Sequence, residues 1–200
     1  MSPSSSSCTT LAATLWPIEN ERASRIGRFL ILAILGSAAL GLSAKLQFSM
    51  EPVPITLQPL VLALMAGAYG WRLGLAALGL QVLTGLMGLP TLPGTLGPAS
   101  LWSAESGFLA GAALAVFVIG YLAERGWDRR VVLSWSAMLL GFVLLYGCGA
   151  LGVASLLGWA AVREDLLGAL HLSALLVQLG VAALILPWIW TKVSARESQS

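Results

Sequence analysis

Charged side chains are scarce in this sequence. Only 10% of its 200 residues are Asp, Glu, Lys or Arg, while 58% are hydrophobic. Soluble globular domains carry about 25% charged residues, so the shortage of charge excludes an ordinary soluble domain and predicts an integral membrane protein embedded in the lipid bilayer. The lysines and arginines form no cluster interleaved with aromatic residues, so no nucleic-acid partner is expected.

The residue types that usually carry catalysis are scarce as well, with one histidine and two cysteines. Cys8 and Cys148 have no metal-ligand spacing, and we expect His171 to contact a neighbouring helix. The sequence contains neither a Gly-x-Ser-x-Gly turn, nor a His-Glu-x-x-His motif, nor a phosphate-binding G-x-x-x-x-G-K-[ST] loop. It therefore predicts no catalytic residue, no metal, no cofactor and no ATP site, and it disfavours an enzyme.

Long uncharged runs fill most of the chain, and a helix needs about 20 apolar residues to cross a bilayer. Glycine and proline interrupt the longest run after residue 89. These runs predict an all-α integral membrane protein with about six transmembrane helices. The expected helices cover residues 29–44 with flanking residues from 26 to 46, 52–71, 73–89, 106–123, 131–162 with a turn after Leu151, and 166–190.

The positive charges indicate the orientation of these helices. An even number of spans places nearly all lysines and arginines on one side, and only Lys45 and Arg163 on the other. By the positive-inside rule, both termini are then cytoplasmic. We expect a cytoplasmic N-terminal segment over residues 1–28, a transmembrane domain over 29–191 and a cytoplasmic tail over 192–200.

Two alternatives remain for the apolar part of the N-terminal segment. Residues 11–28 form either a short helix at the membrane interface, with Trp16 suited to that level, or a tether that only orients the protein.

A proline-rich segment, Glu-Pro-Val-Pro-Ile-Thr-Leu-Gln-Pro at 51–59, separates the first two apolar runs. Its first two prolines remove backbone donors and favour extended backbone at the residues before them. We therefore expect residues 45–55 to be extended, and they are a candidate lid. A helix should open near Thr56, with Thr56 as its cap and Pro59 in its first turn. Gln58 then presents an amide at the membrane end of that helix, where it needs a helix or a ligand as partner.

The sequence Val-Pro-Ile-Thr-Leu-Gln at 53–58 resembles a signature of the BioY family, the biotin-binding S components of energy-coupling-factor (ECF) vitamin transporters. Three further motifs match: Gly85-x-x-Gly88-Leu89-Pro90, Ser106-Gly107-Phe108-Leu109-x-Gly111 and Asp165-Leu166-Leu167. The resemblance covers roughly residues 30 to 190. It implies an ECF S-component-like bundle that binds biotin at the outer face of a prokaryotic-type cell membrane.

The same resemblance implies partners. A transmembrane coupling protein and two ATPase subunits of an ECF module would supply the energy, so that only the partners use ATP. Biotin would bind tightly outside and be released inside after the whole subunit rotates in the membrane. Two alternatives stay open: an S component for another small vitamin, and a small membrane enzyme or structural subunit.

Polar and aromatic residues near the outer helix ends form the candidate ligand-binding site. Its residues are Thr56, Gln58, Gln81, Thr84, Trp102, Phe108, Arg163 and Asp165. Two glutamine amides and a carboxylate suit the two N–H donors and one carbonyl of a ureido group, and aromatic rings suit a fused ring system. Each has a structural alternative: Asp165 as a first-turn residue stabilised by the helix dipole, Trp102 as an interfacial anchor, and the remaining polar side chains as helix–helix contacts.

The chain departs from the family pattern at the start of the last helix. The family commonly shows Asp-x-x-Lys there, whereas Gly168 stands three residues after Asp165 in this sequence. Arg163, two residues before Asp165, is the cation that we expect to take the place of the missing lysine.

A stripe of small residues marks the first transmembrane helix. Ala33, Ser37 and Gly41 recur every four residues, a spacing that lets another helix approach closely. In the S components that this chain resembles, a similar surface on the first helix docks the coupling protein. The alternative is that the stripe packs within this chain.

Overall fold

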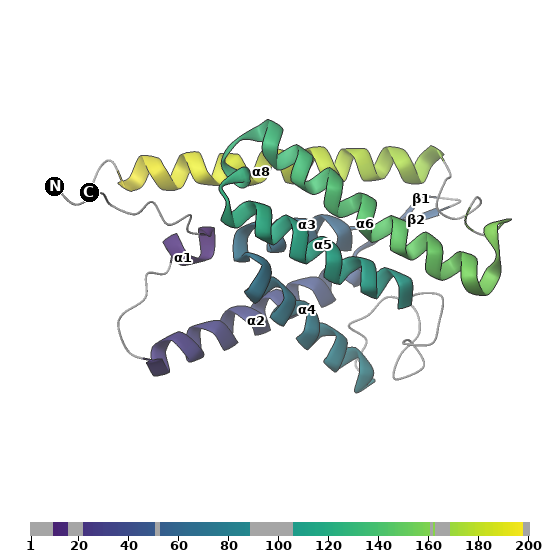
Figure 1. Cartoon of the computed structure of the whole chain (residues 1–200), viewed down its shortest axis with the longest axis horizontal. Helices are drawn as coiled ribbons and strands as arrows, with labels where there is room; N and C mark the ends of the chain where they lie inside the picture. Colours follow the sequence, from purple (N-terminus) through teal and green to yellow (C-terminus); the bar gives the residue numbers. More distant parts are fainter. Residues whose placement is uncertain are drawn as a thin grey trace.

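The computed structural model describes residues 10–15, 22–50, 53–88, 106–160, 162 and 169–197. Its helices form an elongated bundle in which α5 and α6 lie side by side and α8 runs along the bundle's length (Figure 1). The elements are α1 (Leu11–Leu15), α2 (Arg22–Lys45), β1 (Gln47–Met50), β2 (Val53–Thr56), α3 (Gln58–Tyr69), α4 (Trp71–Leu86), α5 (Ser106–Glu124), η2 (Trp127–Arg129), α6 (Val131–Leu157) and α8 (Ala169–Glu197). The predicted helical membrane fold is confirmed.

Within the described residues, four helical stretches are long and apolar enough to cross a membrane. They cover residues 25–45, 106–124, 131–157 and 175–193. The second and third predicted spans are shorter than expected, because α3 has 12 residues and α4 has 16. At 1.5 Å per residue these helices measure about 18 and 24 Å, less than the roughly 30 Å of a hydrocarbon core.

Gly70 separates α3 from α4 with a φ of +79°, a conformation that glycine adopts without strain. A side chain at Gly70 would also collide with the Glu124 carboxylate and with the Thr10 methyl group. The backbone of α5 also approaches this point closely, because a Cβ at Gly120 would lie too near the Trp71 backbone nitrogen to fit. The structure thus places the boundary between the second and third predicted helices, expected at residues 71–73, at Gly70, where the backbones of α4 and α5 pack closely.

The predicted extended segment is an antiparallel hairpin in which Met50 pairs with Val53. The helix after it begins at Gln58 with Pro59 in its first turn, as predicted. The predicted cap is wrong: Leu57 is the N-cap residue, and no side chain caps the helix. Thr56 is still part of the β2 strand, and the Leu57 N–H donates to the Leu46 carbonyl at 3.3 Å.

The turn predicted after Leu151 is also wrong, because α6 continues to Leu157 and is ended by Gly158, which has a φ of +83°. The small residues that suggested a turn instead allow α6 to pack closely against α5. A Cβ at Gly107 would lie 2.8 Å from the Gly152 Cα, and one at Gly111 would lie 2.5 Å from the Leu145 carbonyl oxygen. Such glycines let the backbones of α5 and α6 touch, as is common in membrane helix pairs.

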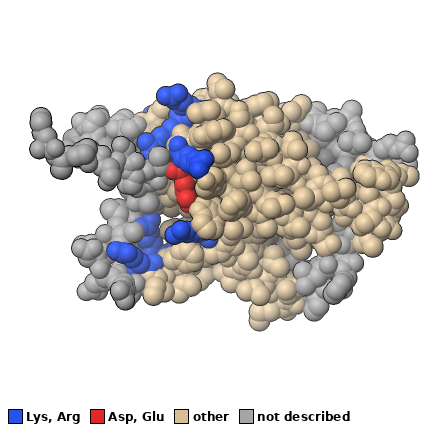
Figure 2. Space-filling model, viewed as in Figure 1, with Lys and Arg blue, Asp and Glu red and all other residues tan. Residues whose placement is uncertain are grey.

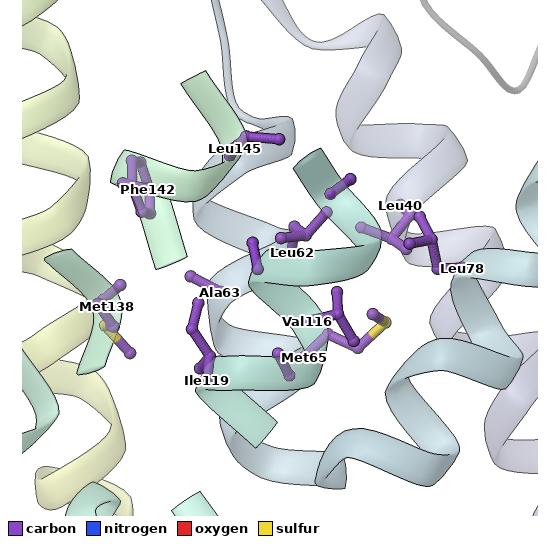
Figure 3. Packing of buried hydrophobic residues seen from close by; sticks show 14 of the residues in the cluster. Leu40, Leu62, Ala63, Met65, Leu78, Val116, Ile119, Met138, Phe142 and Leu145 are labelled. Carbon is purple, nitrogen blue, oxygen red and sulfur yellow. The ribbon is translucent and has the colours of Figure 1, made fainter. Parts of the chain in front are cut away.

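The core draws apolar side chains from every long helix, among them Leu40 of α2, Leu62 of α3, Leu78 of α4, Val116 of α5 and Phe142 of α6 (Figure 3). Large apolar side chains also cover the outside of the bundle. Helices that are hydrophobic on all sides are typical of membrane spans, whose outward faces meet lipid. Association in lipid then depends on close packing and on polar contacts between helices.

The expected boundaries at residues 28/29 and 191/192 fall inside α2 and α8. Of residues 11–28, for which an interfacial helix and a tether were the two alternatives, residues 22–28 belong to α2. Residues 11–15 form a separate short helix, and its Leu11 is only 2% exposed and belongs to the core cluster. Trp16 lies outside the described residues.

Candidate ligand-binding site at the outer end of the bundle

The two ends of the bundle differ in charge. Figure 2 shows lysine and arginine side chains gathered at one end, where α2 begins, α5 is followed by η2, and α8 ends. Among the described side chains, Lys45 at the exposed C-terminus of α2 is the one lysine or arginine at the opposite end. By the positive-inside rule the basic end faces the cytoplasm, and the opposite end is the outer one.

The outer end brings together the elements that carry the predicted polar residues. The β1–β2 hairpin, the start of α3, the end of α4, the start of α5, the end of α6 and the start of α8 all lie there (Figure 1). Strand β2 packs against α2 and α8, so the hairpin joins the first and last long helices. Gln58 and Phe108 stand in the first turns of α3 and α5, and Thr84 stands in the last turn of α4.

Two glutamine amides in this half are shielded from solvent to different degrees. Gln58 is half-buried as the first residue of α3, and Gln81 of α4 has no exposed surface. The Thr84 hydroxyl donates to the Gln81 backbone carbonyl at 2.8 Å, so its proton is used within the helix. A fully buried amide in an apolar bundle must be hydrogen-bonded, since leaving it unbonded costs about 1–3 kcal/mol. Gln81 is therefore placed to hold either a neighbouring helix or a ligand.

Aromatic rings form an apolar wall where α5 meets α6. Phe108 is half-buried and packs edge-on against Tyr146 of α6, with ring centroids 6.0 Å apart. Tyr146 in turn lies 6.2 Å from Phe142, and the Phe108 ring covers Gly149. Sequence reasoning found Phe108 and missed Tyr146 and Gly149. The signal was available, because Phe142, Tyr146 and Gly149 share one face of a helix at spacings of four and three.

Buried polar residues that were not predicted from the sequence also lie inside the spans. Gln178 of α8 is 7% exposed, and Ser43 near the outer end of α2 is 2% exposed and donates to the Leu40 carbonyl at 2.8 Å. An amide inside an otherwise apolar run is itself a signal, because polar groups within membrane spans face the interior of a bundle.

Three predicted ligand residues, Trp102, Arg163 and Asp165, lie outside the described residues. The backbone of Thr56 pairs with Gln47 in the hairpin, while its side chain lies outside the described part. The hairpin is in the place expected of a lid, and lid motion stays a prediction.

The stripe predicted for docking faces the inside of the bundle. Ala33 is 5% exposed, Ser37 is 7% exposed, and Gly41 is also buried. On the same face, a Cβ at Gly36 would lie 2.9 Å from the Ala77 Cβ of α4. This packing corresponds to the second alternative, contact within the chain, and a docking role would require α2 to be uncovered.

A buried carboxylate lies at the cytoplasmic end, away from the candidate site. Asp128 of η2 is 4% exposed and accepts a hydrogen bond from the Trp190 indole nitrogen of α8. The Arg129 guanidinium lies 4.4 Å from the centroid of the same indole ring. Burial raises the pKa of the Asp128 carboxyl, although the Trp190 hydrogen bond opposes this shift. The arrangement fixes the α5–α6 connection to α8.

Among the described residues, no group of three or more His, Cys, Asp or Glu side chains could hold a metal ion. The chemistry that the outer end supports is recognition of a small molecule by amides and aromatic rings.

Comparisons with known proteins point to one family. A family model described as the BioY family matches residues 18–195. The chain is 35% identical to the biotin transporter BioY of Rhizobium etli over 142 residues, which cover 66% of this chain and 76% of that protein. It is also 35% identical to the biotin transporter BioY of Thermotoga maritima over 121 residues, 60% of this chain and 72% of that protein.

The fold is similar to a crystal structure of the S-component for biotin from an ECF-type ABC transporter. The TM-score is 0.71, and the match covers 86% of this chain and 95% of that chain at 18% identity. The likeness shows that the helical arrangement is that of an S-component.

Proposed function

The chain belongs to the BioY family, and from this membership we propose that it takes up biotin as the membrane-embedded substrate-binding S subunit of an ECF-type transporter. Curated relatives that share 35% identity are named biotin transporters. Within the structure, the observation that carries the proposal is Gln81, an amide without exposed surface in the outer half of a multi-pass apolar bundle. Membership of a transporter family also supports the expectation that the chain is not an enzyme.

The amides would bind the polar groups of the ligand, and the aromatic wall would contact its apolar surface. Gln58 and Gln81 offer both N–H donors and carbonyl acceptors, which complement the donors and the carbonyl of a ureido group. Phe108 and Tyr146 offer apolar surface to a fused ring. The ring edges of the biotin bicycle would meet polar groups while its faces meet apolar ones, so orientation as well as affinity follows from this arrangement.

The proposal extends to the residues outside the described part. Asp165 as an ionised carboxylate would accept the ureido N–H donors, and charge-assisted bonds of this kind are roughly twice as strong as neutral ones. Trp102 would stack on the bicycle, and Arg163 would supply the positive charge that the family places three residues after the aspartate.

Energy for release would come from partners in a prokaryotic-type cell membrane. The sequence lacks a G-x-x-x-x-G-K-[ST] loop, so a transmembrane coupling protein and two ATPase subunits would use the ATP. The proposed division of labour is capture of biotin by this chain at the outer face and powered release into the cell by the complete module.

Binding of radiolabelled biotin to detergent-purified protein tests the proposal. We expect a Kd in the nanomolar range, about −12 kcal/mol. Gln81→Met keeps the side-chain volume and removes the amide, and it should weaken binding by about tenfold or more, since a hydrogen bond to a buried partner is worth about 1–3 kcal/mol. Ser155→Ala is the matched control, because Ser155 is an exposed residue of α6 whose hydroxyl bonds to the Gly152 carbonyl.

Two outcomes would contradict the proposal. Wild-type affinity in Gln81→Met would remove Gln81 from the site, and absence of biotin binding by the wild type would remove biotin as the ligand. Gly168 at the family's lysine position makes another small vitamin the second candidate. A panel of unlabelled vitamins that compete, or fail to compete, with biotin decides between the two.

A further inference from the structure

A row of three aromatic rings joins α4 and α5 at the cytoplasmic end of the bundle. Trp71, the first residue of α4, meets Phe117 of α5 edge-on with ring centroids 5.6 Å apart, and Phe117 stacks on Tyr121 at 6.0 Å. The Phe117 side chain is 42% exposed and that of Tyr121 is 39% exposed. Exposed rings near the end of a membrane helix lie at the level where hydrocarbon meets the lipid headgroups. This aromatic row therefore faces lipid.

Arginines cover both end rings of the aromatic row. The Arg72 guanidinium lies 5.1 Å from the centroid of the Trp71 ring. The Arg125 guanidinium lies 4.2 Å from the centroid of the Tyr121 ring and donates a hydrogen bond to the Tyr121 hydroxyl. A guanidinium that stacks on a ring uses its face, so most of its in-plane N–H donors stay available. Stacking also restricts the side chain, which lowers the entropy cost of binding an anion.

The charges of these two arginines are not compensated within the described part of the chain. Both side chains are exposed, and no carboxylate there forms an ion pair with Arg72 or Arg125. The Glu124 carboxylate lies against Gly70, and the Asp128 carboxylate is buried and accepts a hydrogen bond from α8. Two uncompensated cations beside exposed rings suit a ligand that is anionic at one end and apolar along its length.

The exposed face of α5 continues from the aromatic row toward the middle of the membrane. Tyr121, Phe117, Leu114 and Ala110 are all exposed and follow one another at spacings of four and three residues, so they share one face of the helix. From residue 121 to residue 110 the helix rises by about 16 Å at 1.5 Å per residue. This length is roughly half of the 30 Å hydrocarbon core, which is the depth of one leaflet.

We propose that the cytoplasmic ends of α4 and α5 form a binding site for one anionic phospholipid. Arg72 and Arg125 bind its headgroup, and an acyl chain lies along Phe117 and Leu114. Guanidinium groups pair well with phosphate, and the anionic lipids of the cytoplasmic leaflet supply this chemistry at the right level. The site lies at the end of the bundle opposite the candidate biotin site, and it does not depend on the identity of the transported ligand.

Native mass spectrometry of the detergent-purified chain measures lipid binding directly. The chain is titrated with dioleoylphosphatidylglycerol, which is anionic, and with dioleoylphosphatidylcholine, which has the same acyl chains and no net charge. The parent chain should bind the first molecule of the anionic lipid about tenfold or more tightly than the second lipid, because each arginine near an anionic headgroup contributes about fivefold. Arg72→Gln and Arg125→Gln should each weaken binding of the anionic lipid by about fivefold. The double variant should bind the two lipids about equally.

Lys192→Gln is the matched control. Lys192 is also an exposed cation beside an exposed ring, with its ammonium 5.9 Å from the centroid of Trp188, but both residues belong to α8 alone. This change should leave the affinity for the anionic lipid within about twofold. A second measurement is the melting temperature, which the anionic lipid should raise in the parent chain because it binds the folded state. That rise should be absent from the Arg72→Gln/Arg125→Gln variant, whose melting temperature without lipid should match the parent's.

Three results would overturn the site. Equal affinity of the parent chain for the two lipids would remove the preference for an anionic headgroup. Equal losses in Lys192→Gln and Arg125→Gln would show that the whole basic end attracts anionic lipid without a defined site. Displacement of the lipid by an equal concentration of glycerol phosphate would assign the arginines to a soluble anion. None of these measurements uses biotin, so the lipid site can fail while the proposed function stands.

Discussion

The contact between Phe108 and Gly149 links the candidate site to the packing of α5 and α6, and Gly149→Ala tests it. A Cβ at Gly149 would lie 2.5 Å from Cδ1 and 2.6 Å from Cζ of the Phe108 ring, with Cε1 nearer still. Carbon atoms in contact are about 3.5–4.0 Å apart, so the ring has to retreat by about 1 Å. Overpacking of this kind costs typically about 1–3 kcal/mol.

Gly147→Ala is the matched control. Gly147 lies two residues earlier in α6, and nothing stands within 4 Å of a Cβ built there. Alanine is favoured over glycine inside a helix by up to about 1 kcal/mol, so this variant should be neutral or stabilising. The two substitutions make the same chemical change in one helix, and only their surroundings differ.

Thermal unfolding in detergent and biotin titration supply the two measurements. For a chain of this size, 1 kcal/mol corresponds to about 2–4 °C, so Gly149→Ala should lower the melting temperature by roughly 3–10 °C. It should also weaken biotin binding, because the displaced ring belongs to the proposed apolar wall. In a Phe108→Ala background the alanine at 149 has room, and its effect on stability should largely disappear.

This double-mutant cycle can fail in two ways. If Gly149→Ala is as harmless as Gly147→Ala, then the ring does not lie over Gly149. If the loss of stability persists without the Phe108 ring, then the collision is with some other part of the bundle. Either result would refute the geometry on which the aromatic wall is built.

Gly111→Ala should lower the melting temperature by a similar amount, because the new Cβ would lie 2.5 Å from the Leu145 carbonyl oxygen and would push α5 away from α6. Gly79→Ala is the control, because a Cβ at Gly79 has open space around it. Equal melting temperatures of the two variants would contradict the contact at Gly111. Burial holds the Asp128 pKa above its ordinary value, so the folded state binds the proton more tightly than the unfolded state does. The stability of the fold should therefore fall as the pH rises from the ordinary pKa of an aspartate through the raised pKa of Asp128. Asp128→Asn should flatten this slope, and a slope that is unchanged in melting curves recorded at several pH values would assign it to another group. Trp190→Phe keeps a ring but removes the donor to Asp128, and it should lower the melting temperature; no change would show that this hydrogen bond adds nothing to stability.

Some features of the fold could be predicted because they depend on local chemistry. The helix over 106–124 was predicted to within one residue, since polar and proline-rich segments bound an uncharged run. The extended segment before Gln58 follows from two prolines, which exclude helix whatever surrounds them. The helix bundle and its orientation follow from hydropathy and from the asymmetry of positive charge, which the lipid bilayer enforces along the whole chain.

Other features needed the neighbouring helices. The boundary between α3 and α4 was predicted to within two residues from the charge of Arg72, but hydropathy contains no trace of the crowding of Gly70 by Gly120 and Glu124. The glycines of α6 continue a helix instead of forming a turn, because α5 presents its own glycines to them. The same limit applies to the candidate site. Sequence pattern identified Gln81 and Phe108, and the spacing within α6 marks the face that carries Tyr146, but the contact of Tyr146 with Phe108 depends on how α5 and α6 pack.

The sequence by itself determined that this chain is an integral membrane protein and which of its ends faces the cytoplasm. It also determined which residues are extended before α3 and which family its motifs resemble. These properties depend on residue type and on order along the chain. Only the tertiary structure decided that Leu11 fills the core, that the stripe beginning at Ala33 faces inward, and that α3 and α4 stop short of a full span. Side-chain periodicity shows that a helix has a face, but the partner of that face is decided by three-dimensional packing.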